Sequence, residues 1–397
     1  MMRAQRSARQ FLVASLGEGR LLPELTEDEW RRLPDLALDH GVPTLINGVL
    51  ADTEAPAEVR QAVRDHAMGS LAVQLQVEAD LRVVSAVLEP TGVAWATVKG
   101  PALSEHWYAR SGQRTYVDLD VVVDPAGFDR VLDALLDAGA VLVDRNFTHA
   151  LHQRRAELNL VLPHGTVLDL HWHVLNTPQL RAQFPLSMDQ WLSRRIPIRI
   201  GRLEVPTFDA EDTLLHLCLH TVLSGGRKLS WFRDMHEVIA AGQVDWQVFF
   251  KRTESAQAGL LVAVALERTR RLCDAVVPEA YEDRLAVGGR SWQRGLRVLE
   301  AVSPPGGAMD RRLSGQLVWK STRGNTGDSL RALGQTFAKD LVHPLLHEPE
   351  HPWRRPGRRT PERKDNPLRR PADDTGDRAR YLEYVASQAR GGGHHLE

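Results

Sequence analysis

Asp118 and Asp120 are two carboxylates one residue apart inside the otherwise apolar stretch RTYVDLDVVV. Alternate side chains of a β-strand point to the same face, so both carboxylates are expected on one face. Val117, Leu119 and Val121 would then face a hydrophobic core. Two carboxylates this close repel each other and raise each other's pKa unless a cation lies between them. The pair predicts a cation site or, as the simpler alternative, two solvated aspartates on an edge strand.

A second stretch, TVLDLHWHV, offers a third carboxylate with the same alternation. Asp169 shares one face with His171 and His173, and the intervening apolar residues take the other face. Three aspartates from two strands can bind two metal ions about 3.5–4 Å apart, which suits in-line attack on phosphorus. We therefore expect Asp118, Asp120 and Asp169 to be the catalytic metal ligands. Oxygen ligands favour two Mg²⁺ ions, for which Mn²⁺ can substitute.

The two histidines after Asp169 allow another interpretation. Imidazole is a common ligand of zinc, so His171 and His173 could belong to a zinc site. Because Mg²⁺ chemistry does not use imidazole ligands, we expect both histidines to contact the substrate or to support the metal ligands.

The segment VKGPALSEHWY joins a short apolar strand to the start of a helix at or just after Pro101. Backbone N–H groups at a helix N-terminus bind phosphate, and Gly100 lets the backbone approach closely. Lys99, one of six lysines in the chain, and Arg114 are expected to reach the phosphates of a nucleotide. A solvated loop position is the alternative for Lys99.

The elements that would position these residues form an α+β core, a small mixed β-sheet with helices, at residues 91–208. The strand-like stretches are residues 93–98, 115–123, 147–153, 156–162 and 166–174. Helical patterns fill the N-terminal region, residues 1–90, and a C-terminal domain, residues 209–348, which includes an expected helix at 329–346. Residues 349–397 are rich in proline and arginine, which predicts a tail that is largely disordered or loosely docked.

Composition excludes several classes of function. The 397 residues carry a formal net charge of −1 and include two cysteines without CxxC spacing. A near-neutral charge gives no general attraction to nucleic acid, and no stretch approaches the ~20 apolar residues of a membrane span. Isolated cysteines argue against a disulfide framework. We expect a cytoplasmic protein with no membrane association and no nucleic-acid partner.

The order of a strand, Lys-Gly, a helix, RTYVDLDVVV and then VLDLHWHV resembles the DNA polymerase β-type nucleotidyltransferase superfamily. More closely, it resembles a branch of bacterial proteins known as nucleotidyltransferase family 5. LALDHGVPTLINGVL and LLHLCLHTVLSGGRKLSWFRDMHEVI also resemble segments of that family, and the resemblance covers roughly residues 10–300. Lys-Gly stands where the wider superfamily has Gly-Ser or Gly-Gly, which leaves open the group that replaces the serine.

The resemblance implies an Mg-dependent enzyme that moves a nucleoside monophosphate, most simply AMP from ATP, to an acceptor hydroxyl and releases pyrophosphate. It implies metal binding by the three aspartates and phosphate binding by Lys99 and Gly100. A small molecule or peptide, as in bacterial natural-product or peptide-modification chemistry, is the preferred acceptor. His220, Arg233 and Asp234 lie in the family-like segment and are expected to line the acceptor pocket, with a polar contact between helices as the alternative.

Two other classes of function stay open. The first is a catalytically silent NTP-binding or regulatory protein of the same fold, although all three carboxylates are present. The second is a metal-dependent phosphohydrolase that uses His171 and His173.

Overall fold

The computed structural model describes residues 4–17, 19–110, 112–305, 367–369 and 375–390. The chain divides into two compact units, which we call the sheet unit and the helical unit. The sheet unit contains the described parts of residues 70–112, 116–209 and 358–397, and the helical unit contains those of residues 1–69, 113–115 and 210–357. The expected helix at 329–346 and residues 349–366 of the expected tail lie outside the described residues.

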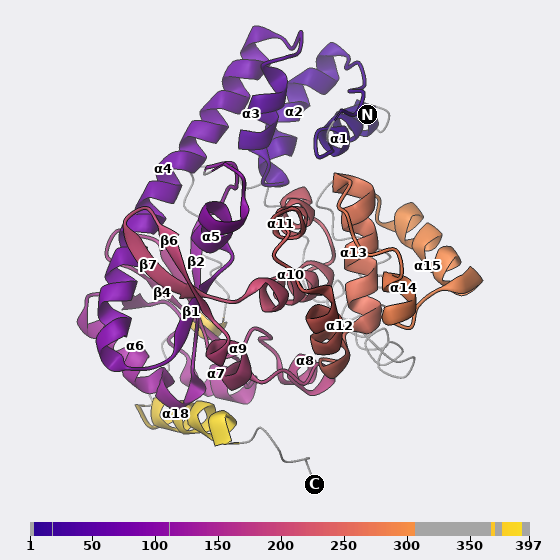
Figure 1. Cartoon of the computed structure of the whole chain (residues 1–397). Helices are drawn as coiled ribbons and strands as arrows, with labels where there is room; N and C mark the ends of the chain where they lie inside the picture. The colour runs from indigo at the N-terminus through magenta and orange to yellow at the C-terminus, as the bar shows by residue number, and fades with distance from the viewer. Residues whose placement is uncertain (1–3, 18, 111, 306–366, 370–374, 391–397) are drawn as a thin grey trace, which may run out of the picture. The chain divides into compact units, whose positions relative to one another are not determined.

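The predicted α+β class is confirmed, because helices flank a five-stranded mixed sheet (Figure 1). The strands lie in the order β1 (Trp95–Val98), β2 (Asp118–Val123), β5 (Val167–His171), β4 (Glu157–Val161) and β3 (Val141–Leu142). β2 and β5 are parallel, and the other neighbours are antiparallel. A separate antiparallel hairpin consists of β6 (Ile196–Ile200) and β7 (Leu203–Thr207).

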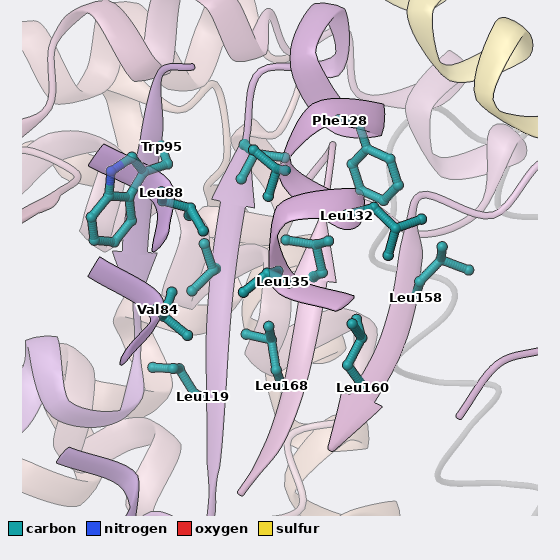
Figure 2. Packing of buried hydrophobic residues seen from close by; sticks show 14 of the residues in the cluster. Val84, Leu88, Trp95, Leu119, Phe128, Leu132, Leu135, Leu158, Leu160 and Leu168 are labelled. Atoms are coloured by element: carbon teal, nitrogen blue, oxygen red, sulfur yellow. The ribbon is translucent and has the colours of Figure 1, made fainter. Parts of the chain in front are cut away.

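The hydrophobic core of the sheet unit lies between one face of the sheet and two helices, α4 (Ala57–Leu88) and α6 (Phe128–Asp137). Figure 2 shows leucines of β2, β4 and β5 gathered with side chains of both helices, namely Leu119, Leu158, Leu160, Leu168, Val84, Leu88, Phe128, Leu132 and Leu135. The strand leucines alternate with polar residues, and the helical residues recur at three to four positions. The opposite face of the sheet is therefore left to the polar side chains.

The remaining elements of the sheet unit are short except at the C-terminus. They are η1 (Glu89–Thr91), α5 (Gly100–Ala102), η2 (Leu103–Trp107), η3 (Pro125–Gly127), α7 (Phe147–His152), α8 (Pro178–Gln183), α9 (Met188–Ser193), η4 (Pro367–Arg369) and α18 (Thr375–Arg390).

The strand expected at residues 147–153 is wrong, because this segment is helix α7. The side chain of Asn146 caps the helix by accepting a hydrogen bond from the backbone N–H of His149 at 3.0 Å. Phe147 and Ala150, three residues apart, are the buried positions, as the helical period requires. A capping asparagine outweighs an alternation that spans only a few residues.

Strand β2 begins at Asp118, later than the sequence pattern suggests. Tyr116 is buried in the core, whereas the side chain of Val117 is 62% exposed. The expected alternation therefore fails before Asp118 and holds from Asp118 onward.

The hairpin of β6 and β7 was not predicted, although Ile196, Ile198 and Ile200 alternate with other residues. Each strand contains a proline, and Pro197 lies opposite Pro206. Proline disfavours a strand prediction because it has no backbone N–H to donate to a neighbouring strand. Strands that contain proline are therefore found mainly at the edges of sheets.

Part of the expected tail is a docked helix. Within α18, yellow in Figure 1, Tyr381 and Val385 are fully buried, and the helix packs against α7 and η3. The Tyr381 hydroxyl donates to the carbonyl of Arg155 at 3.1 Å. The proline-rich composition before α18 concealed two apolar residues four positions apart, which is the spacing of one helical face.

The helical unit combines the N-terminal and C-terminal helices that the sequence analysis treats as separate regions. Its elements are α1 (Ala4–Ala14), α2 (Glu27–Asp39), α3 (Pro43–Leu50), the first part of α4, α10 (Ala210–Leu223), α11 (Leu229–Ala240), α12 (Trp246–Ser255), α13 (Gly259–Cys273), α14 (Tyr281–Arg284) and α15 (Gly289–Val302). Helices α10, α11 and α13 pack against one another. Throughout the described residues, every helix is too short or too polar to span a membrane.

Candidate active site

Polar side chains gather on the face of the sheet opposite the core, where strand register sets their positions. Asp120 of β2 lies opposite Asp169 of β5, and Asn159 of β4 lies opposite Asp169 on its other side. His171 follows two residues after Asp169 and lies opposite Glu157 of β4. Three neighbouring strands thus present carboxylate, amide and imidazole groups on one surface, which we call the polar face.

Asp120, Asp169 and His171 form the cluster on this face that could hold a metal ion. One ligand atom from each lies within 4.8 Å of the others. Asp118 begins the same strand two residues before Asp120, and its charge acts on both Asp169 and Lys99. Asp118 is not one of the three residues whose ligand atoms meet this distance.

Lys99 joins the cluster from the end of β1. Its Nζ atom lies 2.9 Å from Asp120 Oδ1, and the side chain is only 16% exposed. The backbone of Lys99 adopts φ 54° and ψ −132°, which is strained for a residue with a side chain and is typical of functional sites. At Gly100, a Cβ atom would lie 3.3 Å from the backbone oxygen of Asp118, so glycine permits a close approach to β2.

The two facing carboxylates have opposite pKa shifts. Burial and the negative charge of Asp120 raise the pKa of Asp169 to about 7. Burial also opposes the charged form of Asp120, but Lys99 and His171 outweigh it and hold the pKa of Asp120 well below its usual range. Carboxylate pairs whose pKa values are driven apart are a feature of acid–base sites.

His171 connects two acidic groups on different strands. Its Nε2 atom is 3.2 Å from Asp120 Oδ1, and its Nδ1 atom is 3.8 Å from Glu157 Oε2. Burial lowers the pKa of His171, but the bond to Asp120 and the charge of Glu157 outweigh it, so the pKa is raised. The imidazole therefore carries positive charge more readily than a free histidine does.

His173 has a different environment from His171. Its Nδ1 atom accepts a hydrogen bond from the backbone N–H of Leu175 at 2.9 Å, and its Nε2 atom lies 3.3 Å from the carbonyl of Leu186. Burial and the nearby charge of Arg181 lower its pKa to about 3. The neutral His173 ring thus holds the chain after β5 in place through its contacts with Leu175 and Leu186.

Arg114 and Asp234 pair with each other within the helical unit. The guanidinium donates from Nε to Asp234 Oδ1 at 2.8 Å and from Nη2 to Oδ2 at 3.1 Å. Both side chains are largely buried, at 10% and 1% exposure. The nucleotide-phosphate role expected of Arg114 stays a prediction, and in this structure two of its nitrogen atoms bind Asp234.

The other two residues of the family-like segment also have partners within the helical unit. Arg233 donates to the carbonyl of Leu16 at 3.1 Å and forms an ion pair with Glu237. His220 stacks edge-on against Trp231 with 5.0 Å between ring centroids. The contact of His220 with Trp231 joins α10 to α11, whereas the pair of Arg233 with Glu237 lies within α11 and Leu16 follows α1. The acceptor-pocket role of these residues stays a prediction.

Two residues of the polar face, Glu157 and Asn159, were not singled out from the sequence. Asn159 Nδ2 donates to Asp169 Oδ1, and Glu157 faces His171. The stretch ELNLV holds a detectable signal, because both polar residues alternate with buried Leu158 and Leu160. The same alternation that identified the other two polar strands applies here.

Comparison with known proteins identifies the family of this chain. No curated protein matches the chain. A family model described as an uncharacterised nucleotidyltransferase matches residues 26–274, more than half of the 397 residues. The matched range contains every residue of the polar face described above, together with Arg114 and Asp234. The chain therefore belongs to this family of uncharacterised nucleotidyltransferases.

Proposed function

We propose that this protein transfers a nucleoside monophosphate, most simply AMP from ATP, to a hydroxyl group of a small-molecule or peptide acceptor. The observation that carries the proposal is the parallel pairing of β2 with β5. This pairing sets Asp120 beside Asp169, with Asp118 two residues earlier on the same strand. Family membership supports the same class of reaction.

The residues present fit divalent cations. Asp120 and Asp169 face each other on a largely buried surface, where the raised pKa of Asp169 reports negative charge that a cation would relieve. Asp118, Asp120 and Asp169 would hold up to two ions, for which Mg²⁺ and Mn²⁺ are the expected choices. When bound, such ions neutralise charge on the phosphates and lower the pKa of an attacking hydroxyl.

The chain's own groups would bind the nucleotide and move one proton. The Lys99 ammonium and the backbone N–H of Gly100 hold the phosphates, so Lys99 exchanges Asp120 for a phosphate when the nucleotide binds. Asp169 accepts the proton of the acceptor hydroxyl as a general base. The acceptor oxygen bonds to the α-phosphorus, the α–β phosphoanhydride bond breaks, and pyrophosphate leaves.

Labelled nucleotides test this reaction. The full chain is incubated with each α-labelled NTP, Mg²⁺ or Mn²⁺, and pools of hydroxyl-bearing small molecules and peptides. We expect label in an acceptor and one pyrophosphate per transfer. Asp120→Asn should abolish the product, whereas Asp129→Asn, at an exposed aspartate of α6, should not.

Two outcomes would contradict the proposal. Transfer that survives in Asp120→Asn would remove the carboxylate site from the reaction. Hydrolysis of phosphoesters without any labelled acceptor would favour the phosphohydrolase alternative instead.

A further inference from the structure

The cation cluster of the polar face contains a nitrogen donor, which an all-oxygen magnesium site does not need. We propose that Asp120, Asp169 and His171 form a cation position that binds a first-row transition-metal ion in preference to Mg²⁺, before any nucleotide arrives. This inference rests on the proposed function, because the ion bound here would be one of the two ions that nucleotidyl transfer would use. Binding itself can be measured without a reaction.

The spacing of the three ligand atoms suits a single ion. Two opposite ligands on an ion with bonds of about 2.1 Å are about 4.2 Å apart. The atoms of Asp120, Asp169 and His171 lie within 4.8 Å of one another, so a small inward movement of side chains closes the site. All three ligands come from adjacent, paired strands. The position therefore needs no oxygen from a nucleotide.

His171 is oriented as a metal-binding histidine would be. Its Nε2 atom faces Asp120, and its Nδ1 atom faces the carboxylate of Glu157 from the opposite side. Nδ1 is buried and makes no hydrogen bond in this structure. An ion at Nε2 would place the remaining ring proton on Nδ1, toward Glu157. A carboxylate behind a ligating histidine is the usual support for such a ligand.

Strand β4 supplies a supporting residue for both His171 and Asp169. Glu157 accepts hydrogen bonds from Asn176 at 2.8 Å and from Arg155 at 3.3 Å, which hold its carboxylate in place. Asn159 donates to Asp169 Oδ1 and to Glu157. The supporting amide and carboxylate are thus already in contact with the residues that would ligate the ion.

The oxygen that anchors the cluster already attracts cations. Asp120 Oδ1 contacts the Lys99 ammonium at 2.9 Å and His171 Nε2 at 3.2 Å. A divalent ion bound to this oxygen and to Nε2 would compete with the Lys99 ammonium. Positive groups converge on this atom even without a metal.

The donor set decides which ion is preferred. Mg²⁺ demands oxygen ligands and loses its water reluctantly, whereas imidazole is a good ligand of transition-metal ions. Mn²⁺ also accepts octahedral oxygen coordination, which suits a site that handles phosphate. The second ion of the proposed reaction would rest on Asp118, Asp120 and nucleotide oxygens, and it can be Mg²⁺.

Manganese binding to the full chain without nucleotide tests the proposal. The electron paramagnetic resonance signal of free Mn²⁺ gives affinity and stoichiometry, and spin-echo modulation from ¹⁴N reports a bound histidine. We expect one Mn²⁺ per chain with ¹⁴N modulation. Mg²⁺ should displace it only at concentrations at least about tenfold higher.

Three variants make the test specific. His171→Gln places an amide near the position of Nε2, so the ¹⁴N modulation should change and Mn²⁺ affinity should fall about tenfold, with Mg²⁺ affinity nearly unchanged. Glu157→Gln should weaken Mn²⁺ binding by about 10–100-fold while retaining the imidazole signal. His152→Gln, at an exposed histidine of α7, should bind as the wild type does. Circular dichroism confirms that each variant is folded.

The outcomes separate this inference from the proposed function. Bound Mn²⁺ without imidazole modulation, or equal affinity for Mg²⁺ and Mn²⁺, overturns the inference even if nucleotidyl transfer proceeds. Imidazole-bound Mn²⁺ in a protein that transfers no nucleotide would support the inference and remove the proposed function.

Discussion

Asp120 is the residue on which the charges of the polar face converge. It contacts Lys99 and His171 through one oxygen atom and lies opposite Asp169 in the sheet. Lys99 therefore acts on the site before any phosphate is present. Its ammonium partly neutralises Asp120 and, at the proposed cation position, would compete with a metal ion for the same oxygen.

Replacing Lys99 should separate these two effects. In Lys99→Met, divalent affinity without nucleotide should rise at least about tenfold, because a close opposite charge is removed from Asp120. Affinity for the nucleotide should fall, because the phosphates lose a cation. Mn²⁺ titration and equilibrium binding of labelled NTP measure the two quantities. Lys251→Met, at an exposed position of α12, is the matched control, and an unchanged Mn²⁺ affinity in Lys99→Met would contradict the expected competition.

The depressed pKa of His173 predicts a loss of stability in acid. The unfolded chain binds a proton on this ring below about pH 6.5, whereas the folded chain resists protonation until about pH 3. The contribution of neutral His173 to the free energy of unfolding is fully present above pH 6.5 and decreases as the pH falls toward 3. The slope for one proton is about 1.4 kcal/mol per pH unit.

Urea unfolding across this pH window measures the effect. His173→Asn should be less stable at pH 7.5, but its unfolding free energy should fall less steeply between pH 6.5 and 4. Identical slopes in the two proteins would show that His173 does not titrate as expected.

At the scale of elements, helix α4 and the turn between β4 and β5 set the register of the polar face. Asp80 of α4 is fully buried and accepts hydrogen bonds from the backbone N–H groups of His164 and Thr166, each at 3.0 Å. Between them, Gly165 adopts φ +96°, a conformation that side chains disfavour. The carboxylate thus fixes the turn that brings Asn159 and Asp169 into register.

Removing this carboxylate should destabilise the sheet unit. Asp80→Ala leaves two buried N–H groups unsatisfied, so the free energy of unfolding should fall by about 3 kcal/mol. Asp65→Ala, at an exposed position of the same helix, should change it by less than about 0.5 kcal/mol. Urea unfolding followed by circular dichroism compares them. Equal stability of both variants would mean that the turn holds without Asp80.

At the scale of the whole molecule, the chain enters the helical unit for three residues immediately before β2. Residues 113–115 belong to the helical unit, whereas the segments on either side belong to the sheet unit. The bidentate pair of Arg114 with Asp234 of α11 holds this short segment. A buried pair of this kind explains why a charged residue directly precedes β2.

A double-mutant cycle tests the structural role of the pair. Arg114→Met deprives buried Asp234 of its guanidinium, which should lower the free energy of unfolding by about 3–5 kcal/mol. Arg114→Met with Asp234→Leu should recover most of this loss, because no charge remains buried. Urea unfolding of the wild type, Arg114→Met, Asp234→Leu and the double variant gives the coupling energy.

The nucleotide supplies the second readout of this cycle. If the stable double variant binds NTP as the wild type does, Arg114 acts only through Asp234. Weaker NTP binding by that variant would instead support the phosphate role expected from the sequence.

The sequence by itself determined the α+β class, the family and the polar faces of β2 and β5. These features depend on local alternation and on short motifs, which are present in the chain before it folds. Where local sequence signals competed, the pattern was misleading. It predicted a strand at α7, and it predicted no element at the proline-containing hairpin of β6 and β7. In α7 the capping Asn146 decided the outcome.

Only the tertiary structure decided which polar residues meet. Asp120 and Asp169 are far apart in the chain, and nothing in their spacing reveals that β2 and β5 pair in parallel. The sequence likewise does not reveal that Lys99 forms an ion pair with Asp120, or that side chains of α18 are buried in the core. Register between distant strands follows from how whole faces are buried, so these polar side chains meet only in the folded protein.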